Sequence, residues 1–328
     1  MKDENLPQLS VIITTAFGYD SIRTTIEHLN KQTVREAIEV IIIAPPGIER
    51  PASAETELED FYNTIIIEAD IDNELYQAWV DAVHQSSAPV VAFGENHAFP
   101  EPVWAEALVE AHKGPWAAVG CIHKNANPHS LRSWAQLFMT YGPWTEPLDS
   151  GEVNDLPGHN SSYKRSVLID YGSELGHKLI RTNIMHMDLR SRGYRLYFES
   201  GAKVQHINIT KTKSILLDLF YNGQLYTAAL ALHKKWPLSK RILNASLEPL
   251  IMLKYFRGTL QNIRRAGYWG KLMPQALPII VSGLTAHFLG KLWGYTVGFG
   301  SVQQQINDFE FDRFKHLIEK DRRLLSSR

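Results

Sequence analysis

Short apolar segments separated by helical patterns constrain the fold of this chain more than any other feature. Runs rich in β-branched residues occupy positions 9–14, 39–43, 64–67 and 90–93, and each has the length and composition of a buried strand. Between them lie segments with apolar residues at helical spacing, such as Glu74–His84. Strands that alternate with helices predict an α/β fold, with a mostly parallel sheet covered by helices on both faces.

Composition limits the kind of protein this chain can form. With 328 residues, 44% of them hydrophobic and 21% charged, it is long and apolar enough to bury the core of one large or two ordinary domains. Its single cysteine, Cys121, excludes an internal disulfide and a cysteine metal cluster. The first ten residues carry acidic side chains and no apolar run, so we expect no secretory signal and a cytoplasmic location.

Charge is distributed unevenly along the chain. Residues 49–110 contain fourteen acidic side chains and one basic side chain, whereas residues 203–271 contain twelve basic and two acidic ones. The basic excess favours binding to phosphate groups or to an anionic membrane surface. The basic segment has no zinc-finger spacing and no RNA-binding signature, and its cations alternate with apolar residues. We therefore do not expect a nucleic-acid partner.

Polar side chains follow the fourth apolar run directly. The run ends at Gly94, and Glu95, Asn96 and His97 come next, before a proline-rich turn. Ligands of open α/β sheets bind beyond the carboxyl ends of the strands, and a carboxylate and an imidazole two residues apart can share a divalent cation. The alternative is a polar turn in which Asn96 caps the next helix.

Four groups of motifs occur in order within the first 210 residues. They are SVIITT with NKQT and EVIII (10–43), ENH with PEPVW (95–104), LPGHNSSYKRSVLIDYG (156–172) and RSRGYRLYFESGAKVQH (190–206). Their order and spacing resemble those of family 2 glycosyltransferases. The resemblance implies a GT-A-like fold, an inverting enzyme that uses a nucleotide-diphosphate sugar, and a divalent metal ion, Mg or Mn.

The resemblance also implies roles for individual residues. Glu95 and His97 stand where the family has an Asp-x-Asp motif, and with His206, just after a predicted edge strand at 202–204, they would hold the metal ion. An alternative for His206 is a hydrogen-bonded structural histidine. The residues implied in contacts with the donor are Thr14, Thr15, Ala44, Glu95, Asn96 and Asn160.

Two further positions differ from the family pattern. The second strand ends in Ala44-Pro45-Pro46, where the family has an acidic pair that contacts the nucleoside, so we expect recognition to depend on backbone groups near Thr14 and Thr15. Residues 180–183 read Ile-Arg-Thr-Asn, where the family has the acidic motif that supplies the general base. An active enzyme must therefore take its base from elsewhere.

Three residues are candidates for that base: Glu174, Asp188 and His159. We rank Glu174 above Asp188, because Glu174 lies in a segment bounded by glycines that would move over a bound sugar. Asp188 lies in a helical pattern, where an ion pair with Arg192 at i+4 is the common explanation. His159 comes next, with a simple structural turn as its alternative.

The sequence changes in character after Thr210, and we place a domain boundary there, between residues 1–210 and 211–328. Apolar residues at helical spacing predict helices over Leu216–Leu232 and Ser239–Arg265. The tail, Asp308–Arg328, has the pattern of one charged helix.

Residues 272–307 contain a single charged side chain, Lys291, and are interrupted by prolines and glycines. A stretch of ~20 apolar residues can cross a bilayer. Three interpretations remain open: an interfacial or re-entrant helical pair, a buried helical subdomain, and a true membrane span. The basic region before this segment favours the anionic cytosolic leaflet.

Together these features predict a glycosyltransferase that moves a sugar from a nucleotide-diphosphate donor to a glycan or lipid-linked acceptor. We expect it to be cytoplasmic, with peripheral or re-entrant association with the cytosolic face of a membrane. The alternative is a non-catalytic relative that binds sugar nucleotides or glycans in a polysaccharide assembly complex. The acidic residues missing from 44–46 and 180–183 favour this alternative.

Overall fold

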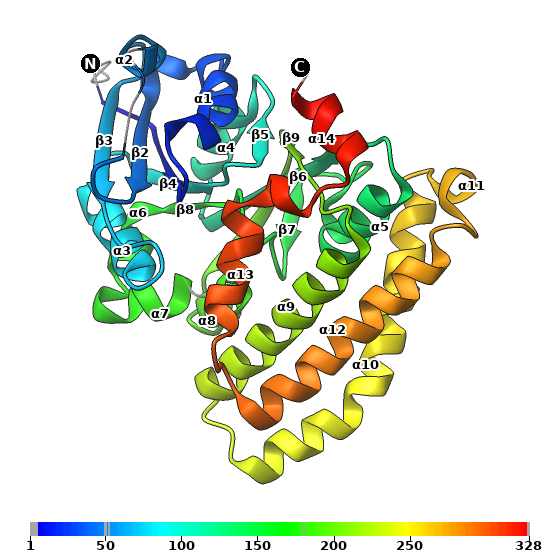
Figure 1. Cartoon of the computed structure of the whole chain (residues 1–328). Helices are drawn as coiled ribbons and strands as arrows, with labels where there is room; N and C mark the ends of the chain where they lie inside the picture. The colour runs from blue at the N-terminus through cyan, green and yellow to red at the C-terminus, as the bar shows by residue number, and fades with distance from the viewer. Residues whose placement is uncertain (1–5, 49–50, 52, 180, 327–328) are drawn as a thin grey trace. The chain divides into compact units, whose positions relative to one another are not determined.

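The computed structural model describes residues 6–48, 51, 53–179 and 181–326 (Figure 1). The chain divides into two compact units, which are described separately. The N-terminal unit consists of the chain up to His123 together with Leu148–Gln205, and the C-terminal unit consists of Lys124–Pro147 with the chain from His206 onward. A segment from within the predicted first domain therefore packs with the C-terminal helices.

Four parallel strands form one half of the sheet. They are β1 (Leu9–Thr14), β2 (Ile38–Ala44), β3 (Asn63–Glu68) and β4 (Val90–Gly94), in the order β3-β2-β1-β4. These strands confirm the four that the apolar runs predicted. All residues of β1 and β2 are buried, as expected for parallel strands that are covered on both faces.

Helices supply much of that cover. The helices α1 (Arg23–Asn30), α2 (Ser53–Leu58) and α4 (Trp104–His112) share one core with alternate residues of β1 and β2. The helix α3 (Leu75–Gln85) contacts β2 and β3 and matches the predicted helix within one residue. Alternation of side chains along each strand places the remaining buried residues of β1 and β2 on the opposite face.

The remaining strands make the sheet mixed. The strand β8 (Ser162–Lys164) is antiparallel to β4 and to β6 (Trp116–Asn125), and β7 (Gly151–Val153) is antiparallel to β9 (Arg195–His206). Since β9 lies between β6 and β5 (Ala98–Pro100), the predicted edge strand is an interior strand of the described sheet. The sequence indicated a mostly parallel sheet because β7 and β8 are too short to show an apolar alternation.

Short helices complete the N-terminal unit. The predicted flexible segment around Glu174 is helical, because a 3-10 turn there continues directly into a short α-helix. These elements are η1 (Tyr19–Ser21), η2 (Arg35–Ala37), α6 (Arg165–Ile169), η4 (Gly172–Glu174), α7 (Leu175–Leu179) and α8 (Thr182–Ser191).

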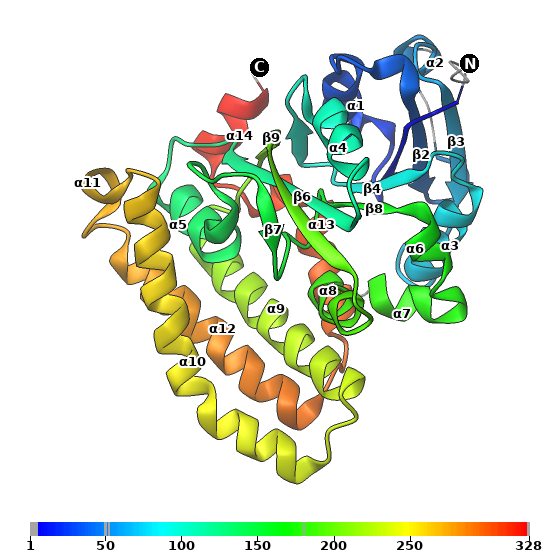
Figure 2. The ribbon, with the colours of Figure 1, turned by 180° about the vertical axis from the view of Figure 1, so that it is seen from behind.

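Three long helices form a layer in the C-terminal unit. The helices α9 (Thr212–His233), α12 (Leu277–Val297) and α10 (Leu238–Arg265) lie side by side, with α12 in the middle (Figures 1 and 2). Two of them, α9 and α10, confirm predicted helices. Glycines let α12 approach α9 closely: a Cβ atom on Gly290 would overlap the backbone of Phe220, so no larger residue fits there without a shift of the helices.

Shorter elements surround this layer. The first of them along the chain, α5 (Leu131–Thr140), shares an apolar core with residues of α10 and α12. The predicted single tail helix is interrupted, because the chain after residue 308 divides among the end of one helix, a 3-10 turn and a last helix. The elements are α5 (Leu131–Thr140), η3 (Gly142–Trp144), α11 (Trp269–Leu272), α13 (Val302–Phe311), η5 (Arg313–His316) and α14 (Glu319–Ser326).

Among the helices that the structure describes, none combines the length and the apolar character that crossing a membrane requires.

A buried carboxylate joins the amino-terminal ends of the central strands. Glu39 on β2 is 1% exposed and accepts hydrogen bonds from Ser10 Oγ at 2.6 Å, from Ser87 N at 2.9 Å and from Ser87 Oγ at 2.7 Å. Ser10 lies opposite Glu39 in the register of β1 and β2. The carboxylate therefore links β2 to β1 and to the segment that leads into β4.

We predict that Glu39→Ala lowers the free energy of unfolding by about 2–4 kcal/mol, because it leaves buried donors without an acceptor. Urea denaturation followed by circular dichroism measures this loss. Glu36→Ala is the control: its side chain is 84% exposed, and we expect a change within about 0.5 kcal/mol. A loss for Glu39→Ala no larger than that of the control would show that the carboxylate contributes nothing to stability.

Burial also determines the charge state of His112 on α4. Its Nε2 atom lies 2.9 Å from Ser162 Oγ. Burial, with a smaller effect from the nearby Lys164 cation, lowers the pKa of His112 from 6.5 to about 3. The unfolded chain therefore binds the extra proton between these two values. The stability that the protein gains by burying neutral His112 is therefore complete above pH 6.5, and it is lost as the pH falls toward 3.

We predict that lowering the pH from 6.5 to 5 decreases the free energy of unfolding by about 2 kcal/mol through the titration of His112. Urea midpoints at pH 7 and pH 5 measure the effect. His112→Gln should reduce this pH dependence, whereas His129→Gln, at an exposed position, should leave it unchanged. Identical pH dependence in wild type and His112→Gln would contradict the prediction.

Candidate functional site

Glu95 is the residue around which the candidate site is built. It follows β4 directly, and its backbone carbonyl accepts a hydrogen bond from Thr25 Oγ1 of α1 at 3.1 Å. Its side chain is buried, which is rare for a carboxylate unless other groups stabilise the charge. Because Ile13 of β1 pairs with Gly94 of β4, Glu95 lies at the carboxyl edge of the parallel strands.

Three polar side chains surround this carboxylate. Asn160 Nδ2 donates a hydrogen bond to Oε2 of Glu95 at 2.7 Å. His97 Nε2 and His159 Nδ1 lie 3.5 Å and 3.4 Å from Oε1, which are distances of ion pairs rather than of good hydrogen bonds. The structure thus brings together four residues that the sequence proposed for donor binding, metal binding and catalysis.

Asn160 adopts a backbone conformation that residues with side chains rarely take. Its φ angle is 57°, in the left-handed region where asparagine is better tolerated than most residues. Its N–H donates to Phe93 O at 3.0 Å, and its carbonyl accepts from Cys121 Sγ at 3.2 Å. The surrounding strands therefore hold a costly backbone conformation, which is a frequent property of binding sites.

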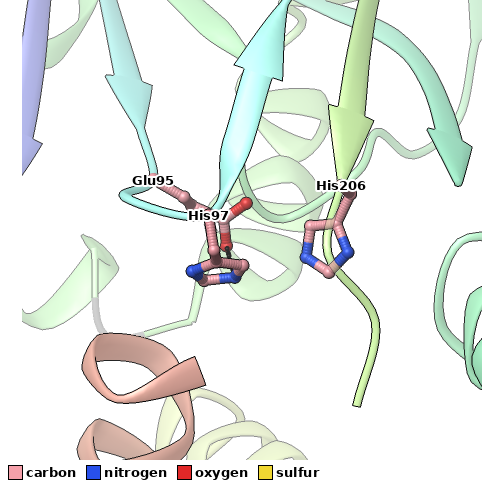
Figure 3. Close-up of side chains that lie close together, drawn as sticks. All are labelled: Glu95, His97 and His206. Atoms are coloured by element: carbon pink, nitrogen blue, oxygen red, sulfur yellow. Dashed lines mark ion pairs between the residues drawn. The ribbon is translucent and has the colours of Figure 1, made fainter. Parts of the chain in front are cut away.

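His97 is oriented by its neighbour Asn96. Nδ1 of His97 lies 2.8 Å from Asn96 Oδ1, and an amide oxygen only accepts, so Nδ1 carries the proton. The other nitrogen, Nε2, faces the Glu95 carboxylate (Figure 3). A lone pair that faces a carboxylate is repelled by it. A cation held by both groups would remove this repulsion.

His206 is the last residue of β9, a continuous strand of the sheet. This strand lies beside β5, which begins directly after His97, so the strand order brings the two imidazoles to the same edge (Figure 3). Nδ1 of His206 lies 3.1 Å from Asn208 Oδ1, and the Tyr141 ring packs edge-on at 4.8 Å. The Asn208 contact leaves Nε2 as the nitrogen with a lone pair.

The side chains of Glu95, His97 and His206 fit a divalent cation. Each offers one ligand atom, the three atoms lie within 4.8 Å of one another, and all three residues are buried. One carboxylate oxygen and two imidazole nitrogens form a mixed donor set, which suits Mn²⁺ and other transition metals better than Mg²⁺. The hydrogen bonds that the two imidazoles donate to Asn96 Oδ1 and Asn208 Oδ1 fix the rings, as is common around bound metals.

Thr14, Thr15 and Ala44 lie at the ends of the neighbouring strands β1 and β2. Thr14 Oγ1 accepts a hydrogen bond from Trp79 Nε1 at 3.0 Å, and Thr15 Oγ lies 2.7 Å from Ser21 Oγ. The Thr14 hydroxyl therefore links the end of β1 to α3, and the Thr15 hydroxyl holds the turn that follows β1. Contacts between these residues and a donor stay a prediction.

An exposed aromatic residue in this segment was missed by the sequence analysis. Phe17 is 64% exposed, although it lies in a turn that the side chain of Thr15 stabilises by accepting the Phe17 N–H at 3.3 Å. An exposed aromatic ring near the carboxyl edge of the strands offers a stacking surface for a nucleobase. The signal in the sequence was an aromatic residue beside Gly18 in a turn that follows a buried strand.

The family described as "Glycosyl transferase family 2" matches residues 10–172. The match spans the four parallel strands and the surroundings of Glu95. The chain carries a family 2 glycosyltransferase domain. The resemblance inferred from the motifs is thereby confirmed, and the fold is GT-A-like, with a mixed sheet and a helical C-terminal unit.

Two solved structures are similar to the chain at low sequence identity. A crystal structure of GalNAc-T7 with UDP, GalNAc and Mn²⁺ matches at 15% identity and a TM-score of 0.46, over 62% of this chain and 44% of that one. A crystal structure of TarS of S. aureus matches at 12% identity and a TM-score of 0.43, over 87% of this chain and 55% of that one. The chain thus spans about half the length of these proteins. No curated protein matches it.

Two candidate bases lie in an ion-pair network that follows the family 2 domain. Asp188 on α8 accepts from Tyr171 OH at 2.8 Å and lies 3.1 Å from Lys178 Nζ and 2.7 Å from Arg192 Nε. Glu174 lies 3.8 Å and 4.0 Å from the same two cations. The ion pair of Asp188 with Arg192, which was the alternative explanation for this residue, is therefore present.

This network weakens Asp188 as a base. Burial by itself would raise the pKa of Asp188, but the hydrogen bonds from Tyr171 and Lys178 and the nearby cations outweigh it, and the pKa lies below its usual value. A carboxylate with a lowered pKa accepts protons less readily. The segment 180–183 contains no carboxylate. Its first residue, Ile180, lies outside the described residues, and Thr182 Oγ1 donates a hydrogen bond to Gly158 O at 2.9 Å.

We predict that Glu95→Gln lowers the affinity for Mn²⁺ by at least about 100-fold, because it removes the only charged ligand from the set. Isothermal titration of the full chain with Mn²⁺ measures the change. Glu110→Gln, at an exposed carboxylate on α4, is the control and should bind as wild type does. Unchanged Mn²⁺ binding by Glu95→Gln would mean that Glu95 only stabilises the turn.

Proposed function

We propose that this chain transfers a sugar from a nucleotide-diphosphate donor to a hydroxyl group of a glycan or lipid-linked acceptor. The observation that carries the proposal is the cluster of Glu95, His97, His159 and Asn160 at the carboxyl edge of a family 2 domain. A turn does not need a buried carboxylate beside two imidazoles. Such groups are typical of sites that stabilise charge and move protons.

The donor nucleotide would lie over the ends of β1, β2 and β4. Thr14 and Ala44 end the first two of these strands, Thr15 follows Thr14, and Asn96 and Asn160 lie beside Glu95. These polar and backbone groups would contact the ribose and the diphosphate. Since the prolines after Ala44 replace an acidic pair, the nucleobase would be held by stacking on another residue, for which the exposed ring of Phe17 is placed.

A divalent cation would be held by Glu95, His97 and His206, with Mn²⁺ preferred over Mg²⁺ because two of the three ligands are nitrogens. When bound, such an ion supplies a Lewis acid for the charge that develops on a leaving diphosphate. The chain's own contribution is orientation, since Asn96 and Asn208 fix the two imidazole rings. Burial of the three side chains keeps water from competing for these positions.

His159 is the best placed general base. Its side chain is 42% exposed, while its Nδ1 atom lies 3.4 Å from the buried carboxylate of Glu95. The carboxylate would hold the ring and stabilise the imidazolium formed when Nε2 accepts the acceptor's hydroxyl proton. As that proton leaves, the acceptor oxygen bonds to the anomeric carbon, and the bond from this carbon to the diphosphate oxygen breaks.

This assignment reverses the order in which the sequence ranked the three candidates. Glu174 was placed first because a glycine-bounded loop could move, but the residue lies in a 3-10 turn beside Lys178 and Arg192. Asp188 is held by the same cations. The sequence could not show that the carboxylate nearest to His159 in space is Glu95, which is 64 positions away in the chain.

The basic segment 203–271 supports a location at the cytosolic face of a membrane, where lipid-linked acceptors are available. The alternative function, a non-catalytic module that binds sugar nucleotides or glycans, is supported by the absence of acidic residues at 44–46 and 181–183. The two functions differ in turnover and not in donor binding.

We predict that His159→Gln lowers kcat by ~10²–10⁴-fold and changes donor affinity by less than about threefold, as loss of a general base does. Transfer assays with a panel of nucleotide sugars and Mn²⁺ measure kcat, and the thermal shift caused by the donor measures binding. His177→Gln, at an exposed histidine of α7, is the control.

Glu174→Gln, assayed beside it, should keep most of the activity. Loss of turnover in Glu174→Gln with normal turnover in His159→Gln would refute the assignment of the base. A wild-type chain that is stabilised by a nucleotide sugar but never transfers it would establish the binding module instead.

A further inference from the structure

The long helix α10 exposes leucines on the side that faces away from its packing partners. Glu248 and Thr259 lie on its packed side and are 1% and 5% exposed. On the other side Leu243, Leu247 and Leu250 are 53%, 45% and 68% exposed. Their spacing of four and three residues aligns them in one stripe along the helix. Helices of globular proteins normally turn such a stripe toward the core.

Basic side chains occupy the next positions of the same stripe, toward the C-terminal end of α10. Lys254 and Arg257 follow Leu250 at the same four-and-three spacing and are exposed. Three more apolar residues of α10 are exposed: Leu238, Ile242 and Leu253.

Acidic side chains are missing from this surface. Residues 219–307 contain ten basic residues and one acidic residue, Glu248. Glu248 is buried, where its carboxylate lies 2.6 Å from Nζ of the buried Lys291 of α12 and accepts a hydrogen bond from Tyr295 OH at 3.1 Å. This pair neutralises itself inside the helical layer. None of the nine other basic residues is buried, so the charge that the segment exposes is entirely positive.

We propose that α10 docks the chain on the surface of an anionic lipid bilayer. The helix would lie in the plane of the interface, with Leu243, Leu247 and Leu250 at the acyl chains and with Lys254 and Arg257 at the headgroups. At 28 residues the helix is ~42 Å long. An apolar and cationic stripe along it matches an extended anionic surface more closely than a small ligand.

Electrostatic repulsion disfavours a second copy of this chain as the partner that covers the exposed stripe of α10. A symmetric dimer through this stripe would bring the α10 cations of both copies into one interface, and residues 219–307 expose no carboxylate to offset them. Phospholipid headgroups supply the missing negative charge. The inference depends on α10 alone and uses no residue of the proposed transferase site.

Co-sedimentation of the full chain with vesicles tests this proposal. We expect binding to phosphatidylcholine vesicles that contain phosphatidylglycerol, little binding to phosphatidylcholine alone, and release at high salt because salt screens the attraction. Lys254→Gln/Arg257→Gln should weaken binding about thirtyfold, since each cation contributes about fivefold. Leu247→Ser/Leu250→Ser should abolish it. Leu131→Ser, at a leucine of α5 that is 39% exposed, is the control.

Either equal binding to both kinds of vesicle or binding to neither would overturn the proposal. A dimer that light scattering detects in the wild type, and that Leu247→Ser/Leu250→Ser dissociates, would show that a second copy covers the stripe. All variants change exposed side chains, and an unaltered circular dichroism spectrum and melting temperature establish that they fold. Donor thermal shifts of the same variants report on the transferase proposal separately.

Discussion

The buried carboxylate of Glu95 is the constraint on which the candidate site depends. A charge at that depth persists only with partners, and the fold supplies an amide from Asn160 and imidazoles from His97 and His159. Two of these partners are themselves held in place: the His97 ring by its contact with Asn96, and Asn160 by backbone and thiol hydrogen bonds to β4 and β6. The arrangement therefore needs the mixed sheet, because only its strand order joins these segments.

Three buried glutamates in the described part of the chain are stabilised in three different ways. Glu39 is surrounded by neutral hydroxyl and amide donors, Glu248 by the ammonium group of Lys291, and Glu95 by two imidazoles and an amide. The first two arrangements are closed and suit structural roles. Only around Glu95 are there partners that can exchange protons near neutral pH, which distinguishes a site that can take part in chemistry from buried charges that stabilise the fold.

The family match and the local geometry lead to different conclusions about catalysis. The family 2 match explains the fold and the position of the site, whereas the residues that the family uses for the nucleoside and for proton removal are absent from 44–46 and 181–183. Both functions can shift to groups that lie nearby in space. The ring of Phe17 is exposed near the strand ends, and His159 contacts Glu95, so the departures from the family pattern do not by themselves imply loss of activity.

The sequence by itself determined the parallel half of the sheet, the long helices and the position of Glu95-Asn96-His97 directly after a buried strand. It could do so because long β-branched runs, helical spacing and a polar turn after a strand are local signals. The three-residue strands β7 and β8 carry no such signal, and neither does the contact between Glu95 and His159. Periodicity also cannot tell which side of α10 is packed, since Glu248 faces inward and Leu250 outward. Tertiary structure decided these points, because they depend on which distant segments meet and which charges are neutralised there.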